Sequence, residues 1–190
     1  METRTYNVYE LDELTPELKE KVIENYRDIH TGYGWYQFIL EEWTEKLEAL
    51  GYENIDINFN GFGSQGDGAS FTAKSMDLDK WLKVHKRTTH YKKLLKDIHN
   101  YGLAGLTGEV YRLTHHYYHE NTCKASVDGD TKYPELVDEL TAEIESERYE
   151  LCNQLYKDLQ NEYEYLTSDE VILETLKANE YMFNDEGRID

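Results

Sequence analysis

The sequence has few of the residues that define secreted, membrane-bound or metal-stabilised proteins. It contains 2 cysteines and 2 prolines among 190 residues. Cys123 and Cys152 are too few for a disulfide framework or a zinc motif, and we expect both to be reduced and buried. The start, METRTYNVYE, has no apolar segment after a basic one, and no run of about 18 apolar residues follows. We therefore expect a cytoplasmic protein that does not contact a membrane.

Basic residues are also scarce relative to acidic ones. The chain has 20 Lys and Arg against 39 Asp and Glu, a formal net charge of −19. Such a charge repels a phosphate backbone, so we expect no direct nucleic-acid binding. The charge is uneven along the chain. Residues 1–53 carry 13 acids and 5 bases, residues 54–132 carry 9 and 11, and residues 133–190 carry 17 and 4. Two acidic ends therefore flank a nearly neutral middle.

Alternating apolar residues indicate a small antiparallel sheet. Residues 54–61 and 68–74 alternate on either side of a glycine-rich loop. Residues 109–116 and 122–128 form a second hairpin pattern. One helix begins at Pro134 and runs for about 30 residues, far above the globular mean. We predict an α+β fold, with an antiparallel sheet of about four strands packed with helices and a long acidic C-terminal helix.

The rest of the chain is predicted to be mostly helical. Thr15 and Pro16 suit the first turn of a helix, because Thr can cap free amides and Pro has no N–H to leave unpaired. Thr167 and Glu170 have the spacing of a capping box. The remaining predicted elements are a short strand at 5–11 and helices at 15–30, 36–50, 75–86 and 89–101. We expect a single domain over 1–190, with a sheet-containing core at 54–132 and an acidic helical segment at 133–190.

The glycine-rich loop is the least generic part of the sequence. Its motif residues are Gly61, Phe62, Ser64, Gln65, Gly66, Asp67 and Gly68. The loop lacks the lysine and hydroxyl of a phosphate-binding loop, and a strand follows it instead of a helix. We therefore expect no nucleotide site and favour a structural hairpin in which Gln65 and Asp67 hold the loop backbone. A ligand site at this loop is the alternative.

Histidine and lysine clusters give no clear chemistry. His115, His116, His119 and Glu120 would not converge on a metal if they lie on a strand, where successive side chains point to opposite faces. We expect no metal, no cofactor and no enzymatic activity. Convergence of Ser64, Gln65, Asp67 and His116 in one pocket would be the sign of a catalytic site. The bases concentrated between 80 and 96 are interpreted as an internal partner of the acidic helices rather than a phosphate-binding patch.

Four segments resemble a family of proteins encoded by bacteriophages and prophages, some of which are labelled antitoxin-like. They are YELDELTPELKEKVIENYRD at 9–28, GFGSQGDGASF at 61–71, YYHENT at 117–122, and LYKDLQNEYEYLTSDEVILETLKANEYMF at 155–183. The loop and tail carry the family pattern GFxSQGDGAxF and NEYEYLTSDE…ANEYxF. The resemblance implies phage infection as the context and supplies no catalytic residues.

Context and charge together suggest an inhibitor that binds a bacterial defence complex, such as a CRISPR effector, by imitating DNA. The residues that we predict to bind the partner are Glu139, Glu143, Glu147, Glu150, Asp158, Glu162, Tyr163 and Tyr165. One alternative is an antitoxin-like protein that masks a toxin or host enzyme through its long helix. Another is an anti-defence protein that holds a nucleotide signal at the glycine loop. The sequence does not predict an oligomeric state.

Overall fold

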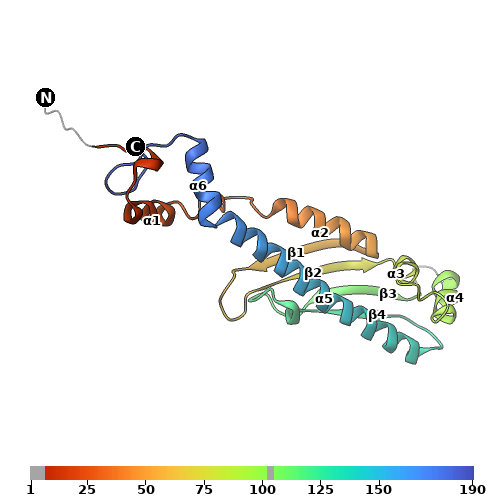
Figure 1. Ribbon diagram of the computed structural model, residues 1–190. Coiled ribbons are helices and arrows are strands. Elements are labelled where there is room, and N and C mark those ends of the chain that lie inside the picture. The colour runs from red at the N-terminus through yellow and green to blue at the C-terminus, as the bar shows by residue number, and fades with distance from the viewer. Residues whose placement is uncertain (1–6, 102–104) are drawn as a thin grey trace. The chain divides into compact units, whose positions relative to one another are not determined.

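A computed structural model describes the backbone of residues 7–101 and 105–190, and the side chains of these residues except 97–101. The chain forms two compact units (Figure 1). The sheet unit is Phe38–Leu159, and the terminal unit combines Met1–Gln37 with Gln160–Asp190. One long helix, α5 (Pro134–Leu166), contributes residues to both units. The expectation of a single domain stays a prediction.

The sheet unit contains four antiparallel strands in the order β1-β2-β3-β4, as predicted. The strands are β1 (Tyr52–Asn60), β2 (Gly68–Met76), β3 (Thr107–Arg112) and β4 (Cys123–Asp128). The predicted extension of β3 to residue 116 is wrong, because the strand ends at Arg112 and Leu113 is exposed. The chain leaves the sheet here to pack segment 117–119 against the glycine loop.

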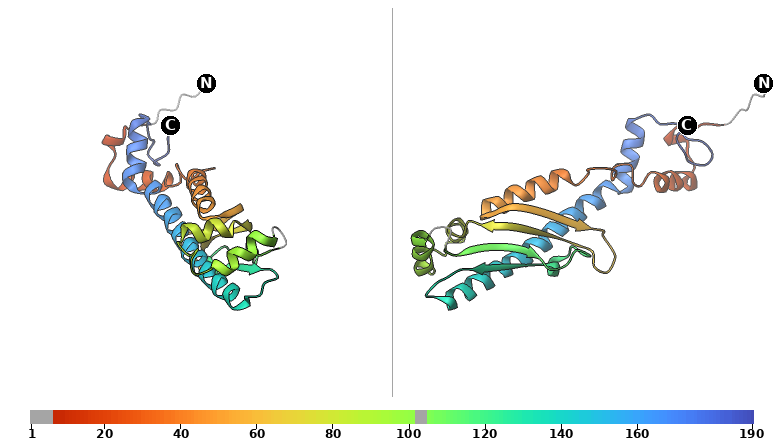
Figure 2. Two further views of the ribbon diagram at one scale, coloured as in Figure 1. Left: turned by 90° about the vertical axis from the view of Figure 1, so that its right-hand side faces the viewer. Right: turned by 180° about the vertical axis from the view of Figure 1, so that it is seen from behind.

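Helix α5 covers one face of the sheet. Ala69, Phe71 and Ala73 of β2 are buried on this face, as alternation along a strand requires. Inward-facing apolar residues of α5 complete the core, and they are Leu140, Ile144, Leu151, Leu155 and Leu159. The opposite face of the sheet, seen in the right-hand view of Figure 2, carries no helix of the described residues.

In the described part of the sheet unit, the short 3-10 helix η3 (Glu120–Thr122) precedes β4, and three α-helices shorter than α5 complete the unit. They are α2 (Gln37–Leu50), which begins at the boundary with the terminal unit, α3 (Leu78–Val84) and α4 (Lys92–Tyr101). Gly51 ends α2 with φ +104°, and a Cβ at this position would lie 2.8 Å from the carbonyl oxygen of Asp77. Only glycine fits that turn. Asp77 then caps α3 by accepting the N–H of Lys80 at 2.9 Å.

The terminal unit pairs the two ends of the chain. It contains the short helix η1 (Leu11–Glu13), α1 (Pro16–Asn25) and α6 (Asp169–Ala178). Phe183 forms single antiparallel bridges with Tyr9 and Ile189. The core of the terminal unit consists of residues from both chain ends, namely Leu11, Val22, Ile23, Ile172, Leu176 and Phe183.

Three local predictions for this unit need correction. Of the strand predicted at 5–11, residues 5 and 6 lie outside the described residues, and the rest forms only the bridge at Tyr9 before η1. Helix α1 does not reach residue 30 and ends at Asn25. The N-cap of α6 is Ser168 rather than Thr167, because the Thr167 hydroxyl donates instead to the Tyr163 carbonyl at 2.7 Å. The cap at Thr15 is confirmed by its bond from the N–H of Leu18 at 3.3 Å.

Candidate binding surface

Glu147 lies at the centre of a hydrogen-bonded network. Its Oε2 accepts from Trp81 Nε1 at 2.6 Å and from the Tyr52 hydroxyl at 3.0 Å, and its Oε1 lies 2.5 Å from His85 Nε2. The side chain of Glu147 is 18% exposed. Burial, with the Glu147 charge as a second cause, raises the pKa of Tyr52 well above its usual value. Glu147 therefore joins α5 to β1 and α3 inside the sheet unit.

Both ring nitrogens of His85 are used by this network. His85 Nδ1 lies 2.8 Å from the Trp81 carbonyl oxygen, which can only accept, so Nδ1 carries a proton. The contact with Glu147 needs a further proton on either Nε2 or the carboxyl group. The imidazole thus has no free nitrogen with which to act as a general base or metal ligand. Its role in the fold is structural.

Basic groups between residues 80 and 96 approach the acidic helices. The ion pair of Arg87 confirms the predicted internal partnership for that residue, whereas Lys80 bonds to a backbone carbonyl at the end of α2. Arg87 Nε lies 3.1 Å from Glu143 Oε2, and Lys80 Nζ donates to the Glu48 carbonyl at 2.7 Å. His90 Nε2 also lies 3.1 Å from Glu139 Oε1. The carboxylates of Glu139 and Glu143 are therefore partly compensated within the chain.

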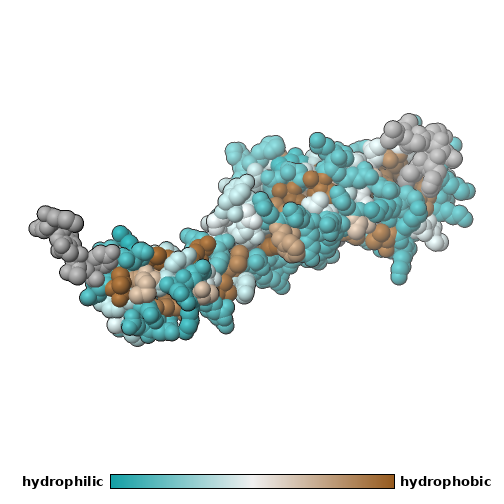
Figure 3. Space-filling view, turned by 90° about the horizontal axis from the view of Figure 1, so that it is seen from above, coloured by the Kyte–Doolittle hydropathy of each residue, from teal (hydrophilic) through white to brown (hydrophobic). Residues whose placement is uncertain are grey.

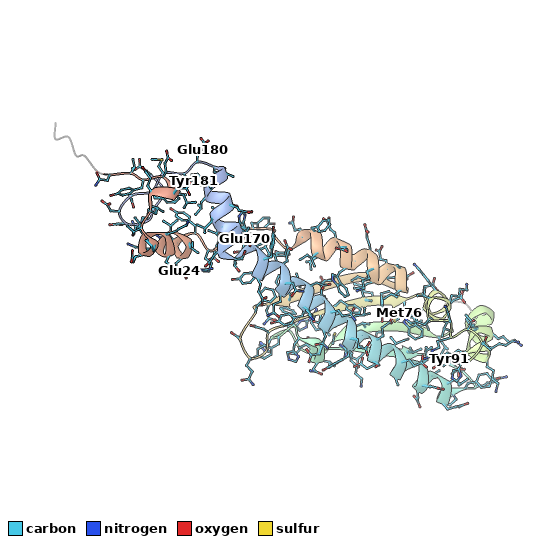
Figure 4. The ribbon with its side chains drawn as sticks, in the orientation of Figure 1. Glu24, Met76, Tyr91, Glu170, Glu180 and Tyr181 are labelled. Carbon is cyan, nitrogen blue, oxygen red and sulfur yellow. The ribbon has the colours of Figure 1, made fainter. Side chains whose placement is uncertain are left out.

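The neighbouring Tyr91 is buried beside these carboxylates at the α4 end of the unit (Figure 4). Burial raises the pKa of its hydroxyl, and the charges of Glu143 and Glu139 raise it further.

The other two predicted residues of α5 in the sheet unit differ in their surroundings. Asp158 Oδ2 accepts from Trp43 Nε1 at 3.1 Å and so fixes α2 against α5. Glu150 is exposed. It borders a cleft of about 380 Å³, whose other lining residues are Trp81, His85, Arg87, Glu143, Ser146 and Glu147.

Five of the eight acidic side chains of α5 between residues 135 and 159 are exposed to solvent. The exposed residues of this segment are Glu135, Asp138, Glu139, Ala142, Ser146, Tyr149, Glu150, Asn153, Gln154, Lys157 and Asp158. The remaining carboxylates are partly buried. Glu145, for example, accepts the N–H of Ala125 at 2.7 Å and thereby satisfies an edge-strand donor of β4.

The terminal unit holds the larger share of the acidic surplus. It has 17 acidic and 6 basic residues, a net charge of −11 over 68 residues, against 22 and 14, a net −8 over 122 residues, in the sheet unit. Among its described residues, 15 carboxylates are exposed, and they are Glu10, Asp12, Glu13, Glu17, Glu20, Glu24, Asp28, Glu164, Asp169, Glu170, Glu174, Glu180, Asp185, Glu186 and Asp190. Figure 4 labels Glu24, Glu170 and Glu180 among them. The face drawn in Figure 3 is correspondingly dominated by hydrophilic residues, with small separate hydrophobic groups.

Three of the cations in the terminal unit are already engaged. Arg27 lies 3.0 Å from both Glu24 and Asp169, and Lys177 lies 2.8 Å from Asp12. Arg188 pairs with the neighbouring Glu186 at 3.4 Å. These pairs leave a large excess of carboxylates facing solvent.

The last three predicted binding residues belong to the terminal unit. The Tyr163 ring packs 5.8 Å from Trp35, and Trp35 packs 5.7 Å from Tyr36. Tyr165 is 60% exposed, whereas Glu162 is half-buried. The structure therefore places Tyr165 at the surface, in the same unit as most of the acidic surplus.

The glycine loop is held by Asp67, as predicted. Asp67 Oδ2 accepts the N–H groups of Gly63 at 3.0 Å and Ser64 at 2.6 Å, and Asp67 Oδ1 accepts from Asn60 Nδ2 at 3.3 Å. Gln65 forms none of these loop bonds, so that part of the prediction is wrong. Phe62 anchors the loop by stacking between Phe59 and Tyr156, at 6.1 Å and 5.5 Å. Gly61 adopts a positive φ of 25° at the start of the loop.

Two loop glycines are required by close packing against segment 117–119. A Cβ at Gly66 would lie 2.7 Å from Cδ1 of Tyr117, and a Cβ at Gly68 would lie 2.4 Å from Cα of His119. The loop and this segment border a shallow cleft of about 540 Å³. Its lining residues are Gln65, Gly66, Asp67, Tyr117, His119 and Glu120. Ser64 and His116 are not among them, so the four residues that would indicate a catalytic site do not converge there.

Sequence reasoning missed the joining of the two acidic ends in one unit. The charge counts of residues 1–53 and 133–190 were a signal, but charges of one sign repel and so do not predict association. An apolar core joins the ends, with Phe183 packed against Tyr26 at 6.3 Å and buried beside Val22 and Leu176. Ion pairs of Arg27 with Asp169 and of Lys177 with Asp12 add to it.

Comparisons with known proteins place the chain in a family. Among the described residues, no helix has the length and apolar character needed to cross a membrane. Searches of curated proteins and of solved structures found no match. A family model described as a domain of unknown function (DUF8835) matches residues 35–169, which include the whole sheet unit and little of the terminal unit. Because this match covers more than two thirds of the chain, the protein belongs to the DUF8835 family.

Proposed function

We propose that this protein is a phage-encoded inhibitor that binds a bacterial defence complex and occupies a basic surface meant for nucleic acid. The observation that carries the proposal is the exposure of 15 of the 16 acidic side chains that the structure describes in the terminal unit. The resemblance of the loop and tail motifs to phage proteins supplies the context. Defence complexes that handle nucleic acid, such as CRISPR effectors, offer the complementary chemistry.

The physical mechanism is competition for cationic side chains. A cleft that binds phosphates is lined with Lys and Arg, and the carboxylates of the terminal unit neutralise the same groups. Exposed aromatic side chains add contact area, since Tyr is enriched at protein interfaces. Tyr33 is 99% exposed and Tyr165 is 60% exposed, and both belong to the terminal unit.

A cleft in the terminal unit fits a cationic side chain of the partner. It has a volume of about 460 Å³ and is lined by Glu10, Leu11, Asp12, Leu176, Lys177, Glu180, Tyr181 and Met182. Carboxylates and apolar side chains line it together, and Asp12 holds Lys177, a cation in the lining. The long apolar stem and charged head of Arg or Lys match that combination.

The predicted binding residues of α5 divide between two roles in this proposal. Glu150, Glu162, Tyr163 and Tyr165 belong to the binding set, together with the exposed faces of Glu139 and Asp158. Glu143 and Glu147 hold the sheet unit together instead, because their carboxylates already accept internal donors.

The test is co-purification of the full chain from infected bacteria, followed by mass spectrometry. The proposal predicts recovery of a nucleic-acid-handling defence protein and a Kd that weakens steeply as salt is raised, because ion release accompanies such binding. Recovery of no defence protein, or binding that is insensitive to salt, would contradict it. Recovery of a toxin bound through α5 would favour the antitoxin-like alternative.

A further inference from the structure

Cys123 and Cys152 meet in the core of the sheet unit. Cys123 begins β4 and is 1% exposed, and Cys152 lies on α5 and is fully buried. Their Sγ atoms are 3.9 Å apart. The pair therefore spans the interface between the sheet and its covering helix, and a side-chain rotation that closes the gap by about 2 Å would reach disulfide bonding distance.

A buried guanidinium group accompanies the two thiols. Arg148 is 2% exposed and lies 3.2 Å from Cys123 Sγ and 3.8 Å from Cys152 Sγ through Nη1. The same nitrogen donates to the Glu120 carbonyl at 2.5 Å. Glu145 holds the other side of the fork, accepting from Nε and Nη2 at 2.8 Å each. The guanidinium is thus fixed with one nitrogen directed at the sulfur of Cys123.

The surroundings make the two thiols unequal. The hydrogen bond from the Cys152 thiol and the charge of Arg148, against the opposing effect of burial, together lower the pKa of Cys123 to about 7. The hydrogen bond to Cys123 raises the pKa of Cys152, and burial adds to this shift. Cys123 is the thiol that forms the thiolate, which is the nucleophilic form of cysteine.

We propose that Cys123 is a peroxide-reactive nucleophile and that Cys152 resolves its oxidised form into a disulfide that ties β4 to α5. The Cys123 thiolate attacks one oxygen of hydrogen peroxide, the O–O bond breaks, and a sulfenic acid and hydroxide form. Cys152 then attacks the sulfenic sulfur, the S–S bond forms, and water leaves. In total, two thiols and one peroxide give one disulfide and two waters. Burial restricts the reaction to small oxidants. The proposal is independent of the proposed inhibitory function.

The test uses the full chain, fully reduced and then exposed to hydrogen peroxide while folded. Intact mass spectrometry should show a loss of about 2 Da, and alkylation after denaturation should find no free thiol. The product should remain monomeric on a denaturing gel without reductant. If both thiols persist in the folded chain at peroxide exposures that oxidise the same chain in denaturant, the proposal is overturned.

Two matched variants test the roles assigned to the cysteines. Cys152→Ser keeps a hydrogen-bond donor beside Cys123, and it should gain about 16 Da as a sulfenic acid that cannot be resolved. Cys123→Ser should oxidise at least tenfold more slowly than Cys152→Ser. Equal rates in the two variants would refute the assignment of Cys123 as the nucleophile.

Arg148→Lys should slow disulfide formation about fivefold, because the charge is kept and the directed N–H is lost. Circular dichroism of each variant confirms that it is folded.

Discussion

The two units expose different shares of their carboxylates. In the sheet unit, the carboxylates of Glu143, Glu145 and Glu147 accept from Arg87, from Arg148 and from Trp81, respectively. Of the acidic side chains that the structure describes, 15 of 16 are exposed in the terminal unit and 15 of 21 in the sheet unit, and the few cations of the terminal unit leave most of its negative charge uncompensated. Net charge alone therefore does not locate a binding surface. A carboxylate that is hydrogen-bonded inside the fold contributes as much to the net charge as one that is exposed to solvent.

Physical chemistry explains this division. A carboxylate can leave water only where hydrogen bonds and opposite charges replace its hydration. The sheet unit supplies such groups from α3, the α3–α4 connection and β1. The terminal unit offers few, so its carboxylates stay at the surface, where they are available to a basic partner.

The largest expected effect comes from removing the central acceptor of the sheet unit. Glu147→Ala leaves the donors of Trp81, Tyr52 and His85 unpaired in a partly buried site, and we expect the free energy of unfolding to fall by about 3–5 kcal/mol. Urea denaturation followed by circular dichroism measures it. Glu150→Ala is the matched control on the same helix, with an expected change within about 0.5 kcal/mol. Equal losses of stability in the two variants would contradict the view that Glu147 holds the sheet unit together and Glu150 does not.

A smaller effect is expected at the glycine loop. In Gly68→Ala, the new Cβ would lie 2.4 Å from the His119 backbone, so one of the two segments must shift. Overpacking of this kind costs about 1–3 kcal/mol. Gly32→Ala, where nothing lies within 4 Å of the new Cβ, is the control and should change stability little. A neutral result for Gly68→Ala in the same urea titration would show that the contact is not tight.

The stability of the protein should depend on pH through the carboxylate of Glu145. Burial raises the pKa of Glu145, but hydrogen bonds from Arg148 and the Ala125 N–H outweigh that effect, and the pKa lies below its usual value. A lowered folded-state pKa gives stability that is present above the unfolded pKa and lost as pH falls through the folded one. The wild type should thus lose stability below about pH 4.5 more steeply than Glu145→Gln. Parallel urea midpoints of the two proteins from pH 6 to pH 3 would contradict this.

The sequence was sufficient for the sheet and the long helix. Alternation around the glycine loop located β1 and β2 within two residues of their observed ends, since register and burial there follow from local pattern. The start of α5 at Pro134 and its length of 33 residues also agree with the periodicity. The partnership of Arg87 with an acidic helix followed from charge alone.

The sequence was insufficient where contacts join distant segments. Arg148 lies on the apolar side of α5, one turn after Ile144 and one turn before Cys152, a position that signals a buried charge. Its partners Glu120 and Cys123 could not be inferred from that spacing. The pairing of Tyr9 with Phe183 is likewise a tertiary contact between chain ends, and no local pattern specifies it.

The central claim is that the carboxylates of the terminal unit contribute more to binding of the partner than those of the sheet unit. Its most direct test compares two triple variants with the same change of charge, using the defence protein recovered by co-purification. One carries Glu20→Gln, Glu170→Gln and Glu174→Gln on α1 and α6, and the other carries Glu41→Gln, Glu42→Gln and Glu45→Gln on α2. All six side chains are exposed, so neither variant should lose more than about 1 kcal/mol of stability. We predict that Kd rises at least tenfold for the first variant and less than twofold for the second. An equal loss of affinity, or a larger loss for the α2 variant, would contradict the claim.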